Sequence, residues 1–222
     1  MNNLNRFGVI KELVPADRVP VDCDIYDTMH VPKRKRGKNM VVTKYKIRTV
    51  LCGNQMNTSK NVGDLRTHSP TLMHRSYKAS CAAAVCKRAR RRGWDVTGAY
   101  LQGKTVALVY ARAPPDCREF DERGIEMVWV LQRPLYGEPD AGRIWYNTFT
   151  HWCIETENFT RSDADPCHLY KQFEDGTDIQ LELYVDDGNT FDTNKAECDA
   201  FYTRLAEQFV ITLDDGGYFL GM

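Results

Sequence analysis

Apolar and polar residues alternate most regularly over residues 179–185, Ile-Gln-Leu-Glu-Leu-Tyr-Val. A period of two residues predicts a strand with one buried face. The turn dipeptide Asp187-Gly188 follows, and residues 189–191 can return as a second strand. The segment therefore predicts a β-hairpin with Asp186 and Asp187 at its tip.

Four further segments have the composition of strands: residues 41–51, 106–111, 127–131 and 210–213. In the first of these, the period of two places Lys44, Lys46 and Arg48 on one face. Such a row of cations suits a triphosphate, and it also suits an edge strand that is protected by charge. Residues 1–43 contain three prolines and predict irregular structure.

Three segments predict helices. Residues 76–92 contain no Gly or Pro and end in a basic run, which favours the negative end of a helix dipole, before Gly93. Asp140 can cap a second helix, and a third follows a capping pattern that begins at Asn194. Buried residues are expected on one face of each of these two helices: Trp145, Phe149, Trp152 and Cys153, then Cys198, Phe201, Tyr202, Leu205 and Phe209.

This order of elements predicts an α+β fold in which helices pack on one face of an antiparallel sheet. Nothing in the composition opposes a folded core, because 42% of the 222 residues are hydrophobic. The chain contains no run of about 18 apolar residues, so no transmembrane helix is predicted. The eight cysteines form no Cys-x-x-Cys pair, so reduced thiols are expected rather than a zinc site.

Charge is distributed unevenly, although the chain as a whole is neutral. Residues 1–92 hold 20 Lys and Arg against 6 Asp and Glu, a net charge of +14, and residues 93–222 hold 10 against 24, a net charge of −14. This asymmetry predicts a basic part that faces nucleic acid. Its basic run, Lys33 to Arg36, suits a phosphate-contacting loop, a nuclear import signal or a solvated loop.

Adjacent carboxylates at a hairpin tip repel each other, and a divalent cation relieves that repulsion. Asp-Asp pairs are also common in turns, so Asp186 and Asp187 alone are a weak signal. Asp95 precedes an apolar stretch 91 residues upstream, and three carboxylates on neighbouring strands are what a two-metal phosphoryl-transfer site needs. Oxygen ligands of this kind suit Mg²⁺.

Six sequence blocks, in order, resemble those of copia-type long-terminal-repeat retrotransposon reverse transcriptases. Two are catalytic motifs, Asp95-Val-Thr-Gly-Ala-Tyr-Leu-Gln-Gly and Tyr184-Val-Asp-Asp. Two more are Leu135-Tyr-Gly with Ala141-Gly-Arg-Ile-Trp-Tyr, and Lys44-Tyr-Lys-Ile-Arg-Thr-Val with Cys52-Gly-Asn-Gln. The remaining blocks are Ser69-Pro70 and Tyr218-Phe-Leu-Gly.

This resemblance implies the fingers and palm of a right-hand polymerase, with a basic fingers region over residues 1–92 and a palm over residues 93–222. The implied reaction joins a deoxynucleoside triphosphate to a primer 3′-hydroxyl with two Mg²⁺ ions, Mn²⁺ being an alternative. The residues to which the resemblance assigns roles fall into three groups. They are Asp95, Asp186, Asp187 and the Val96 carbonyl for the metals; Lys46, Arg48, Tyr100, Tyr136 and Gly137 for the nucleotide; and Tyr184, Tyr218 and Gly221 for primer and template.

The implied partners are an RNA template, a DNA primer or RNA–DNA hybrid, and deoxynucleoside triphosphates, inside the cell in a cytoplasmic particle or the nucleus. Departures from the family pattern include Pro134 and Glu138, where small polar and uncharged residues are usual. A full thumb, ribonuclease H and integrase are not expected within these 222 residues, which predicts a piece of a longer polyprotein. The alternative is a catalytically inactive relic that binds nucleic acid.

Overall fold

The computed structural model describes residues 3–36, 40–56, 67–105, 107–214 and 219. The chain divides into two compact units: Met1–Thr67 with Tyr100–Trp145 (unit 1), and His68–Ala99 with Tyr146–Met222 (unit 2). This division differs from the expected boundary after residue 92, because residues 100–145 belong with the N-terminal part. The assignment of fingers and palm stays a prediction.

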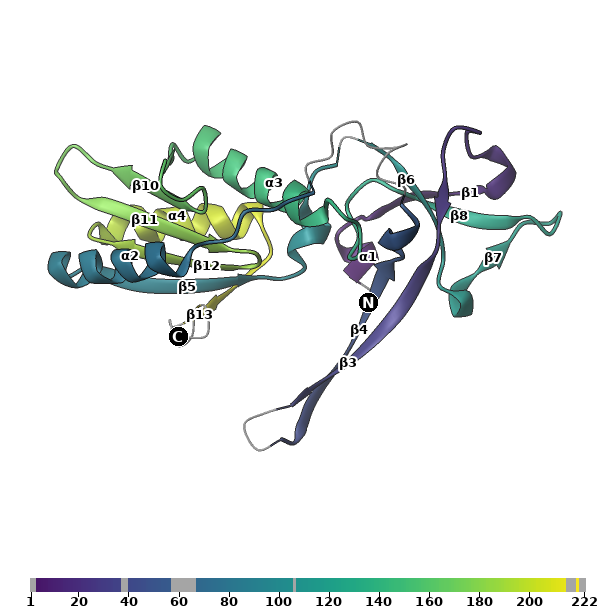
Figure 1. Ribbon diagram of the computed structural model, residues 1–222, viewed down its shortest axis with the longest axis horizontal. Coiled ribbons are helices and arrows are strands. Elements are labelled where there is room, and N and C mark those ends of the chain that lie inside the picture. Colours follow the sequence, from purple (N-terminus) through teal and green to yellow (C-terminus); the bar gives the residue numbers. More distant parts are fainter. Residues whose placement is uncertain (1–2, 37–39, 57–66, 106, 215–218, 220–222) are drawn as a thin grey trace. The chain divides into compact units, whose positions relative to one another are not determined.

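Unit 1 contains a five-stranded sheet in which β1, β8, β6 and β2 lie in that order and β7 pairs with β8 (Figure 1). Its strands are β1 (Ile10–Pro15), β2 (Ile25–Tyr26), β6 (Val109–Arg112), β7 (Glu119–Phe120) and β8 (Glu126–Leu131). A short helix, α1 (Asn3–Arg6), contributes Leu4 to the core, which also contains Leu51, Leu101 and Leu135. The N-terminal segment that was expected to be irregular thus supplies strands of the sheet.

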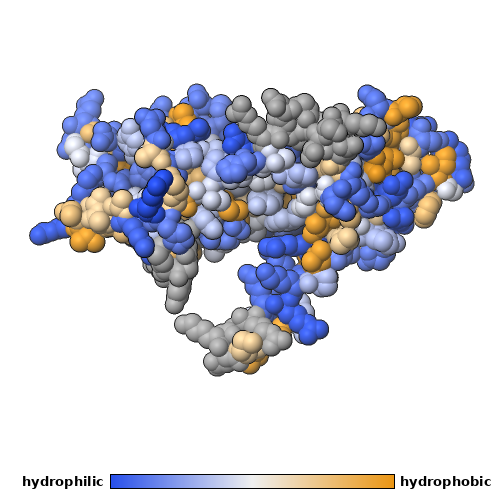
Figure 2. Space-filling model, in the orientation of Figure 1, coloured by the Kyte–Doolittle hydropathy of each residue, from blue (hydrophilic) through white to orange (hydrophobic). Residues whose placement is uncertain are grey.

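Unit 1 also contains a long antiparallel ribbon of two strands, β3 (Thr28–Arg36) and β4 (Val42–Leu51). The prediction of a strand over residues 41–51 is confirmed, whereas the basic run that was expected in a loop lies in β3. Pro32 cannot donate a backbone hydrogen bond, and β3 accommodates it because each strand of a two-stranded ribbon is an edge strand. Figure 2 shows mainly hydrophilic residues along the described length of the ribbon.

Unit 2 is built on a six-stranded antiparallel sheet, in the order β13, β5, β12, β11, β10, β9. The strands are β5 (Arg90–Val96), β9 (Thr160–Arg161), β10 (His168–Gln172), β11 (Asp178–Tyr184), β12 (Asp187–Asp192) and β13 (Ile211–Asp214). Its helices are α2 (His74–Lys87), α3 (Ala141–Glu155, whose residues from Tyr146 belong to unit 2) and α4 (Lys195–Gln208).

Four 3₁₀ turns complete the described elements: η1 (Ala16–Arg18), η2 (Gly53–Gln55), η3 (Ala99–Gln102) and η4 (Pro115–Cys117). No helix within the described ranges is both long and apolar enough to cross a membrane.

Helices cover both faces of this sheet, which corrects the prediction that they pack on one face. On one face the Trp94 ring stacks on Phe149 of α3 and meets Tyr202 of α4 edge-on. On the other face Tyr77 of α2 stacks on Phe191 of β12. The polar positions of β11 therefore face α2 rather than solvent, and the expected half-buried strand is buried on both sides. Figure 1 shows α2 on one side of the sheet and α3 and α4 on the other.

The boundary between α2 and β5 also differs from the prediction. Arg88 adopts a left-handed conformation with φ of 53° and ends the helix, so residues 90–92 belong to β5. Side chains of the basic run then alternate between the faces of the sheet. Arg90 pairs with Asp192, Arg92 pairs with Asp199, and Arg91 donates to Asn189 on the opposite face. Specific partners across the sheet, rather than the helix dipole, account for this run.

The hairpin turn lies two residues earlier than the expected dipeptide Asp187-Gly188. Val185 and Asp186 form the turn, while Asp187 pairs with Tyr184 and begins β12. Gly188 is needed for a different reason, because a Cβ atom there would lie 2.0 Å from the Trp94 ring. The absence of a side chain at Gly188 is thus what lets Trp94 pack against the strand.

Candidate active site

Asp95 and Asp187 face each other directly across β5 and β12. Residues opposite each other in an antiparallel pair project on the same face of the sheet. Both side chains are exposed and lie on the face that α2 covers further along the strands. The fold thus brings two predicted metal ligands together, although 92 positions separate Asp95 from Asp187 in the chain.

Asp186 is held next to this pair by its backbone. Its carbonyl oxygen accepts a hydrogen bond of 2.8 Å from the Val96 nitrogen, which fixes the hairpin tip to β5. The preceding Val185 has φ of 58°, a conformation that β-branched residues rarely adopt. Such strain is found where surrounding structure enforces a functional geometry. Here it turns the chain within two residues and leaves Asp186 exposed beside β5.

A fourth carboxylate, Asp214, lies on the same face. Asp214 is opposite Gly93, two residues from Thr212, which pairs with Asp95. Desolvation, together with the charges of Asp186, Asp95 and Asp214, raises the pKa of the Asp187 carboxyl to about 6. The strand expected over residues 210–213 forms as β13 and includes Asp214, and only the pairing of β13 with β5 reveals the position of this carboxylate. Concentrated negative charge at one edge of the sheet favours cation binding.

A buried polar layer continues this face of the sheet beneath α2. Asn189 donates to Glu182 at 3.2 Å, and Arg91 donates to Asn189 at 2.8 Å. Glu182 and Asn189 are fully buried. Asn189 lies two residues from Asp187 on the same strand, so this hydrogen-bonded layer restrains the strand that carries a predicted ligand. Periodicity could not reveal it, because polar residues in an alternating strand are expected to face solvent.

Unit 1 brings three predicted nucleotide-binding residues together. The Arg48 guanidinium carbon lies 5.2 Å from the centroid of the Tyr136 ring, and that ring lies 5.5 Å from the Tyr100 ring. The Arg48 Nε atom is buried and has no hydrogen-bond partner among the described residues. An arginine that is stacked on an aromatic ring keeps a fixed plane, which suits recognition of a phosphate oxygen.

Close backbone packing fixes Tyr136 and Gly137 beside the end of β4. The Leu51 nitrogen donates to the Tyr136 carbonyl at 2.7 Å. Gly137 has φ of 93°, and a Cβ atom there would lie 2.2 Å from the Leu51 carbonyl oxygen. Only glycine fits this position, so a structural requirement accounts for Gly137 whether or not it contacts a nucleotide.

Glu138, which departs from the family pattern, is buried in the same turn. Its Oε1 atom accepts a hydrogen bond of 2.7 Å from the Leu135 nitrogen. Burial raises the pKa of this carboxyl to about 8, with a smaller contribution from the charge of Asp140. The side chain is therefore mostly protonated at neutral pH, and its charge state matches the uncharged residue that is usual in the family.

Lysines face one another across the ribbon. Lys33 is opposite Lys46 and Lys35 is opposite Lys44, while Arg48 follows on the same face. Like charges directly across a ribbon destabilise it. An anionic ligand would remove that cost, and both phosphate binding and protection of an edge stay predictions for these residues.

The primer and template residues are only partly within the described ranges. Tyr184 ends β11 opposite Asp187, so its side chain shares the face of the carboxylates. Tyr218 and Gly221 lie outside the described residues. The roles assigned to all three stay predictions.

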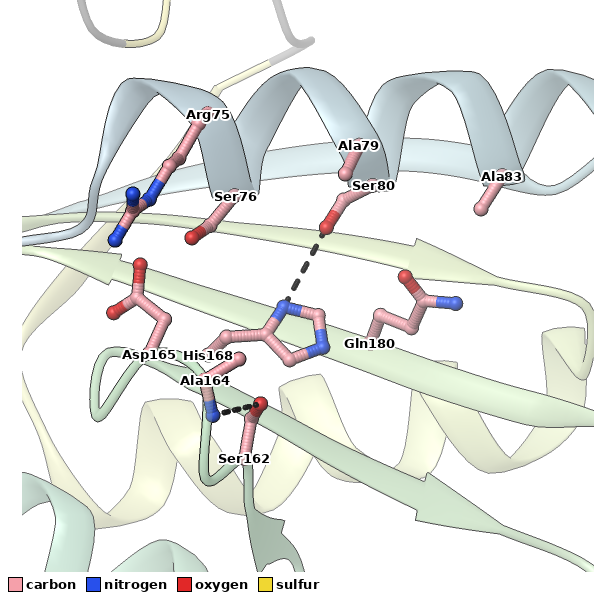
Figure 3. A pocket seen from close by; sticks show the side chains of 10 residues that line it. All are labelled: Arg75, Ser76, Ala79, Ser80, Ala83, Ser162, Ala164, Asp165, His168 and Gln180. Carbon is pink, nitrogen blue, oxygen red and sulfur yellow. Dashed lines mark hydrogen bonds between the residues drawn. The ribbon is translucent and has the colours of Figure 1, made fainter.

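A cavity of about 560 Å³ lies between α2 and the sheet of unit 2 (Figure 3). Small residues of α2, including Ala79 and Ala83, form one wall, and His168 and Gln180 of the sheet form another. Across the cavity, the Ser80 Oγ atom lies 3.5 Å from the His168 Nδ1 atom. Asp95, Asp186 and Asp187 are not among its described lining residues, so the cavity is a feature separate from the carboxylates.

The sequence matches known proteins over most of its length. A model of the family described as reverse transcriptase (RNA-dependent DNA polymerase) matches residues 14–222. The chain is 28% identical over 189 residues to the retrovirus-related Pol polyprotein from transposon TNT 1-94 of Nicotiana tabacum, covering 84% of the chain and 13% of that protein. It is 28% identical over 215 residues to the polyprotein from transposon RE2 of Arabidopsis thaliana, covering 95% of the chain and 14% of that protein.

Among solved structures, the chain is similar to apo telomerase from Candida tropicalis truncated from its C-terminal domain. The match covers 98% of the chain and 54% of the telomerase chain, with a TM-score of 0.41 and 8% identity. Telomerase from Candida albicans, in complex with the TWJ fragment of telomeric RNA, matches 92% of the chain and 44% of its own, with a TM-score of 0.38 and 10% identity. The sequence matches confirm the resemblance to copia-type elements. The chain belongs to the reverse transcriptase (RNA-dependent DNA polymerase) family.

Proposed function

We propose that this chain is an RNA-directed DNA polymerase domain that adds deoxynucleotides to a primer 3′-hydroxyl. The observation that carries the proposal is the convergence of Asp95, Asp186 and Asp187 at one edge of the sheet in unit 2. Membership of the reverse transcriptase family supports the reaction class. The chain spans about an eighth of the polyproteins that it matches, so the activity of this piece is inferred.

The residues at this edge fit divalent metal ions, because the available donors are carboxylate and carbonyl oxygens. Asp95, Asp186 and Asp187 would hold two Mg²⁺ or Mn²⁺ ions, with the Val96 carbonyl as a further donor. When bound, the two ions would activate the attacking hydroxyl and stabilise the leaving pyrophosphate. Desolvation, followed by repulsion from neighbouring carboxylates, raises the pKa of Asp187, and such ions would relieve the repulsion.

The chain's other residues would orient the nucleotide. Arg48, with Lys46 beside it on the ribbon, would bind the triphosphate oxygens. Tyr100 would lie beneath the sugar and exclude a 2′-hydroxyl by contact, while Tyr136 would pack near the templating base. Tyr184 would contact the primer. These assignments rest on the family motifs and on the contact of Arg48, Tyr136 and Tyr100 in unit 1.

A catalytically inactive nucleic-acid binder is the second candidate. The facing lysines of the ribbon favour it, because they would bind an RNA or RNA–DNA backbone without any chemistry at the carboxylates.

Primer extension on an RNA template with Mg²⁺ separates the two candidates. The wild-type chain should extend the primer, and Asp186→Asn should lose extension while it keeps its circular dichroism spectrum and its affinity for the template. Glu174→Gln, an exposed position in the turn between β10 and β11 and outside the six sequence blocks, serves as the control and should extend normally. Template binding without extension by the wild-type chain would reject the polymerase in favour of the binder.

A further inference from the structure

Three side chains of kinds that bind transition metals converge in unit 1, apart from the carboxylates of the candidate active site. They are His30 of β3 and the adjacent Asp116 and Cys117 of η4. Their potential ligand atoms all lie within 4.8 Å of one another. The His30 Nε2 atom is 3.7 Å from Asp116 Oδ2 and 3.7 Å from Cys117 Sγ.

The fold of unit 1 holds these residues together although 87 positions separate His30 from Cys117. Strands β2 and β6 pair in parallel just before the two segments. The Thr28 hydroxyl then donates to the Arg112 carbonyl at 2.7 Å, which ties the start of β3 to the end of β6. The turn η4 follows β6 directly, so this tie positions it beside His30.

The orientation of the His30 ring suits a metal ligand. Its Nδ1 atom lies 3.3 Å from the hydroxyl of Thr49, which is buried and directly opposite on β4. A proton on Nδ1 can be donated to this hydroxyl, which leaves the Nε2 lone pair directed toward Asp116 and Cys117. Such a second hydrogen bond commonly fixes the tautomer of a metal-binding histidine.

The same geometry argues against a nucleophilic cysteine. In a Cys-His-Asp arrangement the thiol and the carboxylate contact different ring nitrogens, so that the carboxylate orients the base. Here Asp116 and Cys117 share the Nε2 atom. The 3.7 Å between Nε2 and Oδ2 also exceeds hydrogen-bond length. These three atoms are instead arranged around a common point.

We propose that His30, Asp116 and Cys117 bind one Zn²⁺ ion, with water as the fourth ligand. Tetrahedral coordination at ordinary Zn–N, Zn–O and Zn–S lengths separates N from O by about 3.3 Å and N from S by about 3.6 Å. The two observed separations of 3.7 Å from the His30 Nε2 atom require only small movements of the exposed Asp116 and Cys117 side chains. A mixed nitrogen, oxygen and sulfur set suits Zn²⁺ and disfavours Mg²⁺, which prefers oxygen alone.

The basic residues near η4 are paired with carboxylates, which limits their repulsion of a bound cation. The basic residues nearest to η4 in the sequence are Arg112 and Arg118. Both form ion pairs with Asp27 and Glu126. Their charges are thereby balanced within a separate cluster. Zinc would join η4 to the base of the ribbon and stabilise unit 1, independently of the proposed polymerase reaction.

Titration of the full chain with Co²⁺ and Zn²⁺, in excess Mg²⁺ that occupies the carboxylates, tests this proposal. Wild type should bind one Zn²⁺ per chain, and Co²⁺ should produce the absorption band of a cobalt–thiolate bond. Cys117→Ser should abolish that band, and His30→Gln should weaken Zn²⁺ binding by roughly tenfold or more. Cys86→Ser, which changes an exposed thiol of α2, should behave as wild type.

Wild-type protein without a cobalt–thiolate band would overturn the proposal. It would also fail if Cys86→Ser removed the band, or if Cys117→Ser bound Zn²⁺ as tightly as wild type. Zinc binding that disappears in Asp186→Asn and persists in His30→Gln would assign the ion to the carboxylates of unit 2. Primer extension plays no part in these readouts, so their failure leaves the polymerase proposal intact.

Discussion

Among single residues, side-chain size decides the packing at a few positions of the sheet in unit 2. Gly188 and Gly93 are a matched pair, because they lie on neighbouring strands of one sheet and neither has a positive φ. A Cβ atom at Gly188 would lie 2.0 Å from the Trp94 ring, whereas one at Gly93 would make ordinary contacts at 3.6 Å. The two positions therefore separate steric overlap from the general effect of a methyl group in a strand.

Gly188→Ala should lower the free energy of unfolding by about 1–3 kcal/mol or more, because the buried Trp94 ring must move. Gly93→Ala should change it by less than about 1 kcal/mol. Urea unfolding of both variants measures the difference. Equal effects would show that Trp94 does not require a glycine beside it.

Tyr100 tests the proposed selection of the sugar. Tyr100→Ala should increase incorporation of ribonucleotides relative to deoxynucleotides by roughly tenfold or more, because the excluded volume is removed. Tyr100→Phe keeps the ring and should retain the preference of wild type. Competition between a ribonucleotide and its deoxy counterpart in primer extension provides the measurement. An unchanged preference in Tyr100→Ala would confine Tyr100 to packing against Tyr136.

Glu138 predicts a pH dependence of stability. Its folded-state pKa of about 8 exceeds the ordinary value of 4.5, so the folded chain holds the proton more tightly than the unfolded chain does. Stability should therefore fall as pH rises from about 4.5 to about 8, by on the order of a few kcal/mol. Glu138→Gln keeps an acceptor for the Leu135 nitrogen and should remove this fall.

The measurement is the unfolding free energy of both proteins at pH 5 and pH 8. The variant should match wild type at pH 5 and exceed it at pH 8. A constant difference across this range would mean that Glu138 is ionised in the folded state.

At the scale of elements, the ribbon of β3 and β4 predicts opposite effects on stability and binding. Lys33→Glu would place a carboxylate opposite Lys46. The new pair should stabilise the ribbon by about 0.2–1 kcal/mol. The same change should weaken RNA binding and lower the slope of log affinity against log salt by roughly one.

Fluorescence anisotropy with labelled RNA at several salt concentrations, together with thermal melts, measures both effects. Lys11→Gln, on β1, is the control and should leave the salt slope unchanged. If Lys33→Glu left RNA affinity intact, the lysines would serve only to protect an exposed ribbon.

Local patterns predicted most elements of unit 2 but not their partners. The capping pattern at Asn194 is confirmed by its hydrogen bond from the Glu197 nitrogen, and all five expected residues of that helix face are buried. By contrast, the basic run after α2 was placed in the helix, because its partners Asp192 and Asp199 are about 100 residues away. Asp214 and the layer of Glu182 and Asn189 were missed for the same reason, since only strand register brings them together.

For the whole molecule, the sequence motifs identified the protein family, which the periodicity of apolar residues could not do. Ordered blocks over four-fifths of the chain indicated the family, which the match over residues 14–222 confirms. The division between units could not be read from charge, because residues 100–145 return to unit 1. The cluster of His30, Asp116 and Cys117 could not be predicted from the sequence either, because His30 and Cys117 lie far apart in the chain.

The proposed polymerase reaction requires Asp95, Asp186 and Asp187 to bind the catalytic metal ions together. A crystal structure of the full chain with Mn²⁺ and a deoxynucleoside triphosphate tests it most directly, through anomalous scattering from manganese. The expected result is manganese peaks within coordination distance of carboxylate oxygens of Asp95 and Asp186, and no such peaks in Asp186→Asn. Manganese located away from these carboxylates in the wild-type crystal, or retained there in Asp186→Asn, would contradict it.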